Sequence, residues 1–184
     1  SDRGVGVNIV GFMMMFFLVN TMSNLFVFSA DREQGQIRRV FASPPTFRSY
    51  LLGHAAYCLT FLIPPFLLLL FLNGIGVRIG FSLAEYAVLM LLMAIVGMSV
   101  GFLLYTGIRK ADNATMLGNS ILILTTVLSG GFGSFSKENR VLDHILDLLP
   151  QKSILQFAIH LQNHEFSSGL LFLLYPVLFS LLLL

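Results

Sequence analysis

The sequence predicts an all-α integral membrane protein, a multi-pass bundle of helices, and three observations lead to this fold class. Hydrophobic residues make up 56% of the 184 residues and charged residues only 11%, against about 25% in an ordinary soluble domain. The mean hydropathy is +0.84. Phe and Leu also gather in charge-free runs that are too long for a small core to bury. A soluble globular domain is therefore excluded.

Several of these apolar runs are long enough to cross a membrane, because about 20 helical residues span the hydrocarbon core. We expect spans at about residues 5–29, 50–72, 86–108, 114–132 and 169–184. The last run is short for a span, and no initiator Met or signal-like leader precedes the first one. We therefore expect residues 1–184 to be a single transmembrane domain from which an upstream first span and the end of the last span are missing.

Basic residues in the connections predict the orientation, because Lys and Arg are enriched on the cytoplasmic side. They are concentrated in residues 30–49 and in the turn after Ile108. We therefore expect these two connections to be cytoplasmic, in a multi-pass protein of the cell membrane, here a bacterial plasma membrane. Basic residues elsewhere are scattered, so the sequence has no electrostatic footprint for a nucleic acid.

Two connections are more than turns. Residues 31–43 predict a short amphipathic helix, because Ile37, Val40 and Phe41 follow helical spacing and Pro44–Pro45 ends the pattern. Residues 134–168 hold two apolar pieces, separated at Pro150, that are each too short to span. We expect the second connection to be a re-entrant pair of half-helices in the outer leaflet.

No catalytic or ligand-binding constellation is present in the sequence. The glycines from Gly130 onwards precede Lys137 without the order of a Walker A loop. His160 and His164 share a helix face but have no defined third metal ligand. The single Cys58 excludes an internal disulfide. We therefore predict no enzyme activity, no metal site and no cofactor in this chain.

Polar side chains inside the predicted spans are the more informative groups, because each must find a partner or face water. Asn20 and Asn24 are four residues apart and share one face of the first span, and Asn119 and Thr125 lie in the fourth. Two interpretations stay open. These side chains either line a translocation path or form hydrogen bonds that hold helices together.

Two further patterns predict how helices pack and bend. Gly97 and Gly101 form a GxxxG motif in the third span, which favours close approach of another helix. Pro64–Pro65 in the middle of the second span predicts a kink, because proline cannot donate the helical hydrogen bond.

The order of residues from 31 to 54 resembles the loop between the second and third spans of type II ATP-binding-cassette (ABC) exporter permeases. In that family an acidic residue, a Gly, a basic and apolar stretch and a Pro precede an aromatic residue and a Gly. The corresponding residues here are Glu33, Gly35, Arg38, Arg39, Pro44, Phe47 and Gly53. The segments 129–132 and 149–150 are similar to the outer end of the family's fifth span and the start of its outer hairpin. The resemblance thus covers nearly the whole chain.

The resemblance implies a permease subunit of an ATP-driven exporter for a hydrophobic or amphipathic substrate. The short helix would be a coupling helix that docks on a separate cytosolic ATPase subunit, which would bind ATP and Mg. A second permease subunit would complete a homodimer or heterodimer. The partner contacts implied here are Glu33, Gly35, Ile37, Arg38, Arg39, Val40 and Phe41.

Other interpretations of the same residues are open. The amphipathic helix could lie on the membrane without a protein partner. The whole chain could be a secondary transporter or channel, or a membrane assembly subunit that transports nothing. A secondary transporter should have ionisable residues at mid-span, whereas Glu85 and Arg109 lie at span ends.

Overall fold

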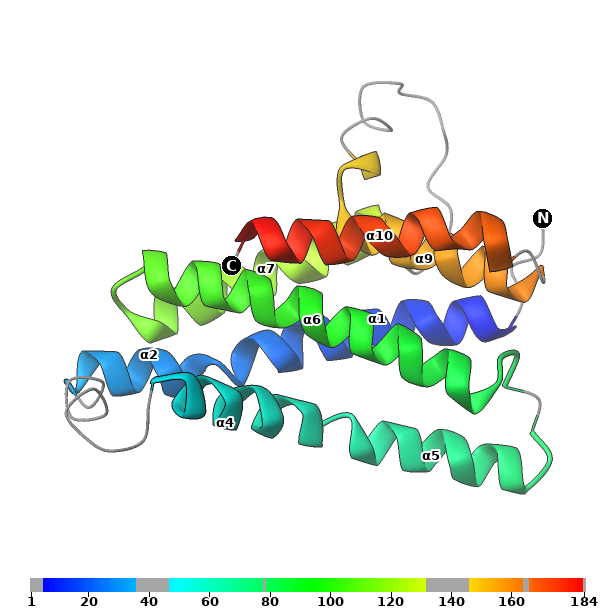
Figure 1. Ribbon diagram of the computed structural model, residues 1–184, viewed down its shortest axis with the longest axis horizontal. Coiled ribbons are helices and arrows are strands. Elements are labelled where there is room, and N and C mark those ends of the chain that lie inside the picture. Colours follow the sequence, from blue (N-terminus) through cyan, green and yellow to red (C-terminus); the bar gives the residue numbers. More distant parts are fainter. Residues whose placement is uncertain (1–4, 36–46, 78, 132–145, 164–165, 184) are drawn as a thin grey trace.

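The computed structural model describes residues 5–35, 47–77, 79–131, 146–163 and 166–183, and the regular structure in these residues is entirely α-helical. The predicted all-α fold is confirmed for this part of the chain. The helices, labelled as in Figure 1, are α1 (Val5–Ser23), α2 (Phe26–Glu33), α4 (Phe47–Thr60), α5 (Ile63–Gly74), α6 (Leu83–Gly107), α7 (Ala111–Leu128), α9 (Pro150–Gln162) and α10 (Phe166–Leu183).

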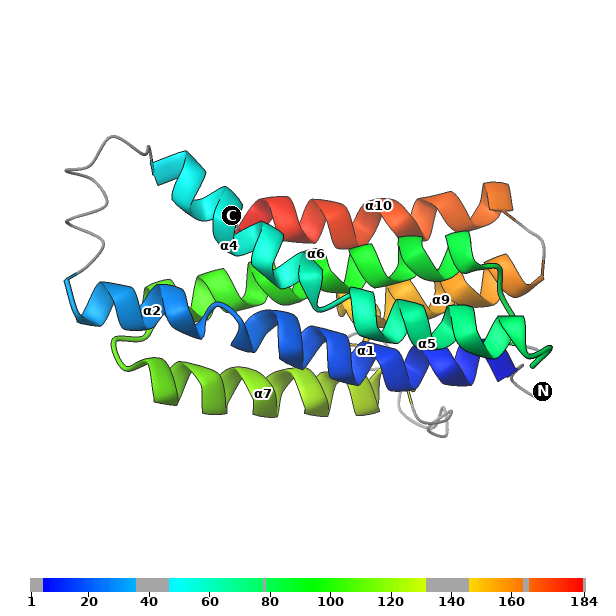
Figure 2. The same cartoon turned by 90° about the horizontal axis from the view of Figure 1, so that it is seen from below.

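The helices run roughly along one direction and form an elongated bundle (Figure 1). The centre is built from α1 and α6, which pack against each other, and α7, α9 and α10 surround them. Helices α4 and α5 pack mainly against α6 and lie along one side of the bundle. In Figure 2, seen from below, α4 and α5 cross in front of the other helices. The α4–α5 pair is therefore the most peripheral part of the described fold.

Three helical segments are long and apolar enough to cross a membrane, namely Gly6–Glu33, Arg48–Gly74 and Leu83–Gly107. They lie at the first three predicted spans. At the fourth and fifth predicted spans the structure has α7 and α10, of 18 residues each. Within the predicted outer hairpin, α9 has 13 residues, fewer than a span requires. Residues 132–145 of that hairpin lie outside the described residues.

The first two spans are both interrupted. A turn at residues 24–25 separates α1 from α2, and residues 61–62 separate α4 from α5. The kink expected at Pro64–Pro65 is confirmed as the second interruption. Both prolines lie in the first turn of α5, where a missing N–H costs little because that group has no helical acceptor. The sequence therefore breaks the helix just before the prolines.

Close packing of α1 against α6 depends on the GxxxG glycines. A Cβ atom at Gly97 would overlap Thr21 Oγ1 and lie 2.9 Å from the Leu18 carbonyl oxygen. A Cβ at Gly101 would lie 3.0 Å from Met22 Cγ. Both glycines thus lie on the face of α6 that contacts α1, and the absence of a side chain lets the two backbones approach.

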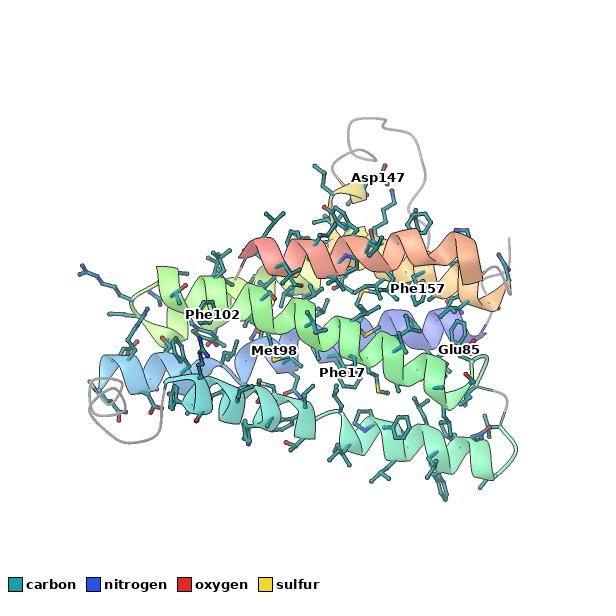
Figure 3. All side chains as sticks on the ribbon, in the orientation of Figure 1. Phe17, Glu85, Met98, Phe102, Asp147 and Phe157 are labelled. Carbon is teal, nitrogen blue, oxygen red and sulfur yellow. The ribbon has the colours of Figure 1, made fainter. Side chains whose placement is uncertain are left out.

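The core follows the same helices. Its buried apolar side chains come mainly from α1, α6 and α9, and they include Met14, Leu18, Met93, Ile154 and Phe157. Figure 3 shows Phe17 and Phe157 within the bundle, with Glu85 at the start of α6. Glu85 and Ser82 form a capping box, in which Ser82 N donates to Glu85 Oε2 at 2.7 Å. The ionisable group therefore marks the end of the span, as its position in the sequence suggests.

Candidate functional site

The end of α2 is fastened to the turn between α6 and α7. Arg32 Nη1 donates to the Thr106 carbonyl oxygen at 2.9 Å, and Nη2 donates to the Ile108 carbonyl oxygen at 2.7 Å. Carbonyls in the last turn of a helix have no intrahelical donor, and a cation is favoured at this end of the helix dipole. Arg32 therefore caps the C-terminus of α6 from a neighbouring helix.

Glu33, the residue after Arg32, caps the N-terminus of α7. Glu33 Oε1 accepts a hydrogen bond from the Ala111 backbone N–H at 2.7 Å. The N-cap residue of α7, Lys110, supplies no side-chain cap of its own. A carboxylate is favoured at a helix N-terminus for the same electrostatic reason that Arg is favoured at a C-terminus. Arg32 and Glu33 together thus hold both sides of the α6–α7 turn.

A second contact joins α2 to α4. The Tyr50 hydroxyl donates to Asp31 Oδ2 at 2.6 Å. The Tyr50 ring lies edge-on to His54, with 4.5 Å between ring centroids, and Phe28 packs beside both rings. The helices that precede and follow residues 36–46 are therefore linked directly to each other.

Gly35 ends α2. Its φ of 71° is in the left-handed region, and its N–H donates to the Arg32 carbonyl oxygen at 3.1 Å. Glycine adopts this conformation at a helix C-terminus without the steric cost that a Cβ adds. Helix α2 continues to Glu33, so Asp31, where the predicted coupling helix was expected to begin, lies in the last turns of α2. The two hydrogen bonds of Arg32 and the bond of Glu33 give the physical reason for this continuation.

The remaining residues predicted for partner contact lie outside the described residues. They are Ile37, Arg38, Arg39, Val40 and Phe41. Both flanks of their segment are described, and both are held by the contacts of Asp31, Arg32, Glu33 and Tyr50. We call these four residues the flank anchors.

The four polar residues predicted for a translocation path lie in two places. Asn20 faces a groove beside α1, and Ser23, one turn further on, donates to Asn119 Oδ1 on α7 at 3.3 Å. The Asn24 side-chain nitrogen is buried without a hydrogen-bond partner among the described residues. Thr125 lies further along α7 and accepts a hydrogen bond from Gln151 Nε2 at 2.9 Å. The structure thus brings Asn20 and Asn119 into one region through Ser23, and places Thr125 at the α7–α9 contact.

The groove beside α1 has a volume of about 900 Å³. Helix α1 forms one wall, Phe61 of the α4–α5 interruption and α5 from Pro64 to Leu72 form the other, and Ile123 of α7 also lines the groove. Its lining side chains are mainly Phe, Met, Leu and Pro, with Asn20 and Ser23 as the polar members. Phe16 and Leu68 are exposed at its edge, so the groove is open to the surroundings of the bundle.

No metal site accompanies these features in the described part of the chain, where no group of three or more His, Cys, Asp and Glu could hold an ion. His160 stacks on Phe172 with 5.2 Å between ring centroids. His144 and His164 lie outside the described residues.

Sequence reasoning missed three of the flank anchors, Asp31, Arg32 and Tyr50. The available signal was the run of charged residues immediately after the first apolar span, at the place where another helix end should lie. The acceptors of Arg32 are backbone carbonyls 74 and 76 residues away, and no side-chain pattern identifies them.

The described residues contain several long apolar helices, which pack closely at glycines and have charged contacts at one end. These features define the class of multi-pass helical membrane proteins. The chain belongs to a particular family of such proteins, since the family model described as ABC-2 type transporter matches residues 2–163. Searches of curated proteins and of solved structures gave no match. The predicted resemblance to ABC exporter permeases is confirmed at the level of this family, and the chain is a transmembrane permease component of an ABC transporter.

Proposed function

We propose that this chain is the permease subunit of an ATP-driven exporter, coupled to a separate cytosolic ATPase subunit through residues 36–46. The ATPase would bind ATP and Mg, and a second permease subunit, identical or related, would complete the transport unit. The substrate is hydrophobic or amphipathic, and the complex works in a bacterial plasma membrane. The family match supports a permease of an ABC transporter.

The observation that carries the coupling proposal is that the flank anchors tie both ends of residues 36–46 to the bundle. Before the segment, Arg32 and Glu33 bind the end of α6 and the start of α7. After it, Tyr50 of α4 binds Asp31 of α2. A displacement of the segment would therefore move α2, α4 and the α6–α7 turn together. This is the mechanical requirement for transmitting closure of an ATPase to the spans.

The segment itself has the composition of a docking helix. Ile37, Val40 and Phe41 would bury their side chains against the ATPase, and Arg38 and Arg39 would pair with its acidic residues or with anionic lipid. A few well-buried residues near the centre of an interface contribute most of its binding energy, so we would change two members of this apolar stripe, Ile37 and Phe41.

The proposal is tested by purifying the tagged full-length chain from its native membrane and assaying Mg-dependent ATP hydrolysis. We expect an equimolar subunit with a Walker A sequence, identified by mass spectrometry. The double variant Ile37→Asp/Phe41→Asp should lose this subunit and the hydrolysis while still inserting into the membrane.

The matched control is Ile75→Asp/Val77→Asp. It places the same two charges at exposed apolar positions just after the C-terminus of α5, at the opposite end of the second apolar segment from residues 36–46. This control should keep the ATPase subunit. Unchanged recovery of the subunit with the Ile37/Phe41 variant would show that residues 36–46 do not dock it. A purified chain that transports alone in liposomes would instead make it a secondary transporter.

A further inference from the structure

The groove between α1 and α5 has a polarity gradient along its length. From Ile9 to Phe17 its α1 wall is apolar, and Leu69 and Leu72 face it from α5. Its polar residues, Asn20 and Ser23, are at the other end, beside Phe61 and the prolines. A volume of about 900 Å³ lies within the range of small-molecule sites, about 300–1,000 Å³.

The helix interruption adds hydrogen-bond acceptors at the same end. Pro64 and Pro65 have no N–H, so the carbonyls of Thr60 and Phe61 lack their regular helical donors. Phe61 and both prolines line the groove. Among the described residues, no group hydrogen-bonds to the Asn20 side chain. Non-helical backbone at membrane depth is tolerated where it is buried in protein or lines a water-filled cavity, so these carbonyls require a hydrogen-bond donor here.

The depth of this polar end separates two kinds of occupant. Asn20 lies near the middle of the apolar segment Gly6–Glu33. A phospholipid of the surrounding bilayer keeps its polar group at the surface, about 15 Å from the mid-plane, since the hydrocarbon core is about 30 Å thick. A molecule whose polar group meets Asn20 has therefore left the position of an ordinary bilayer lipid.

The length of the apolar part fits one alkyl chain. From Ile9 to Asn20 the groove follows α1 for about 16 Å, at about 1.5 Å per residue. This is the depth of about one leaflet. One extended chain can therefore lie along the groove with its polar group at Asn20.

We propose that the groove between α1 and α5 binds a single-chain amphiphile in transit, with its alkyl chain along the exposed side chains of Phe12, Phe16 and Leu68 and a hydrogen-bond-donating polar group at Asn20 and the α4–α5 interruption. The direction of movement rests on the exporter function proposed above. The binding itself needs neither nucleotide nor the ATPase subunit.

The sequence contains no Trp, so a single introduced Trp is an uncontaminated fluorescence reporter. We would place it in the groove as Phe61→Trp and, as a matched lipid-facing control, on α10 as Leu174→Trp, where Leu174 is exposed. The full chain is reconstituted in phosphatidylcholine vesicles and titrated with a dibrominated stearylamine, because bromine quenches Trp on contact. The expected result is saturable quenching of the Phe61→Trp protein at a low mole fraction of amine. The Leu174→Trp protein should show only a linear increase.

A second series tests the polar end. Asn20→Leu in the Phe61→Trp protein should weaken binding of the amine by about fivefold, the effect of one lost hydrogen bond. Ser120→Ala removes a hydroxyl that bonds within α7 and lies outside the groove lining, so it should leave binding unchanged. Leu68→Phe narrows the groove at an exposed position and leaves Asn20 unchanged, so it should also weaken binding of the amine. This variant provides the test if the Asn20→Leu protein does not fold.

Several results would overturn the proposal. Linear quenching in both reporter proteins would show that the amine only partitions into the bilayer. Equal binding of a dibrominated octadecane would show that the polar end recognises nothing. Saturable quenching by dibrominated phosphatidylcholine alone would identify the occupant as a resident lipid. Absence of quenching at Phe61→Trp would show that another segment or subunit covers the groove. Because the assay contains no ATP, each result is distinct from failure of the exporter proposal.

Discussion

Glu33 caps a helix to which it does not belong: its Oε1 accepts from the Ala111 backbone N–H at 2.7 Å, across 78 residues of sequence. Arg32, the preceding residue, binds carbonyls on the other side of the same turn. Adjacent charges of opposite sign thus complement the two opposite helix ends that meet at the α6–α7 turn. The turn cannot separate from α2 without breaking all three hydrogen bonds.

Replacing Glu33 with Ala should lower the free energy of unfolding by about 1 kcal/mol, the usual effect of removing a helix N-cap. Glu33→Gln keeps an acceptor oxygen but loses the charge, so it should fall between Ala and the parent protein. Thermal unfolding in detergent measures the series. Met116→Ala, at a side chain of α7 that is 71% exposed, is the control and should change the midpoint less. Equal midpoints for Glu33→Ala and the parent would mean that the cap contributes nothing.

Arg32→Lys should behave more like Arg32→Ala than like the parent protein. A guanidinium donates to two carbonyls at once, at 2.9 and 2.7 Å, whereas an ammonium group is a compact charge that does not reproduce this fork. We expect faster amide hydrogen exchange at the start of α7 in both variants, measured by mass spectrometry. Exchange in Arg32→Lys that matches the parent would show that charge alone is sufficient.

The Tyr50–Asp31 contact should couple the flanks of residues 36–46. Tyr50→Phe and Asp31→Asn each disturb the 2.6 Å hydrogen bond between these two side chains and leave the packing largely intact. In a double-mutant cycle on the free energy of unfolding we expect an interaction of about 1 kcal/mol. If the exporter proposal is right, each single variant should also lower the transport obtained per ATP hydrolysed. Additive effects on stability would show that the two side chains do not interact.

The α1–α6 contact predicts a graded glycine series. Gly97→Ala should destabilise the bundle most, by about 1–3 kcal/mol, because its Cβ overlaps Thr21 Oγ1 and approaches the Leu18 backbone. Gly101→Ala should cost less, since its Cβ meets side-chain atoms of Leu25 and Met22 at 3.0 Å. Gly107→Ala is the control, with nothing within 4 Å of its Cβ. Thermal midpoints in any other order would refute this account of the packing.

The polar residues of the spans should divide by function. Asn20→Leu, together with Asn24→Leu, should change substrate-dependent transport more than thermal stability. Thr125→Val should do the reverse, because it removes the acceptor of Gln151 and leaves a buried amide unpaired, at a cost of about 1–3 kcal/mol. Transport in vesicles and unfolding in detergent are measured on the same preparations. A loss of stability alone in the Asn variants would assign these residues to helix packing.

The sequence by itself determined the fold class, the positions of the three long apolar helical segments and the helix break at Pro64–Pro65. Hydropathy, span length and the missing N–H of proline act locally, so they can be read from neighbouring residues. The order of residue types around Glu33 and Gly35 also carried the family resemblance, because this order can be compared between sequences without knowing any tertiary contact.

Only the tertiary structure decided which helix ends Arg32 and Glu33 bind, that Tyr50 reaches Asp31, and that Asn20 opens onto a groove rather than onto a helix contact. These relationships join distant residues, and several use backbone groups that every residue possesses. Which residues meet depends on how closely α1 and α6 approach each other and on where α4 and α5 diverge from α1. Helix packing determines both of these distances.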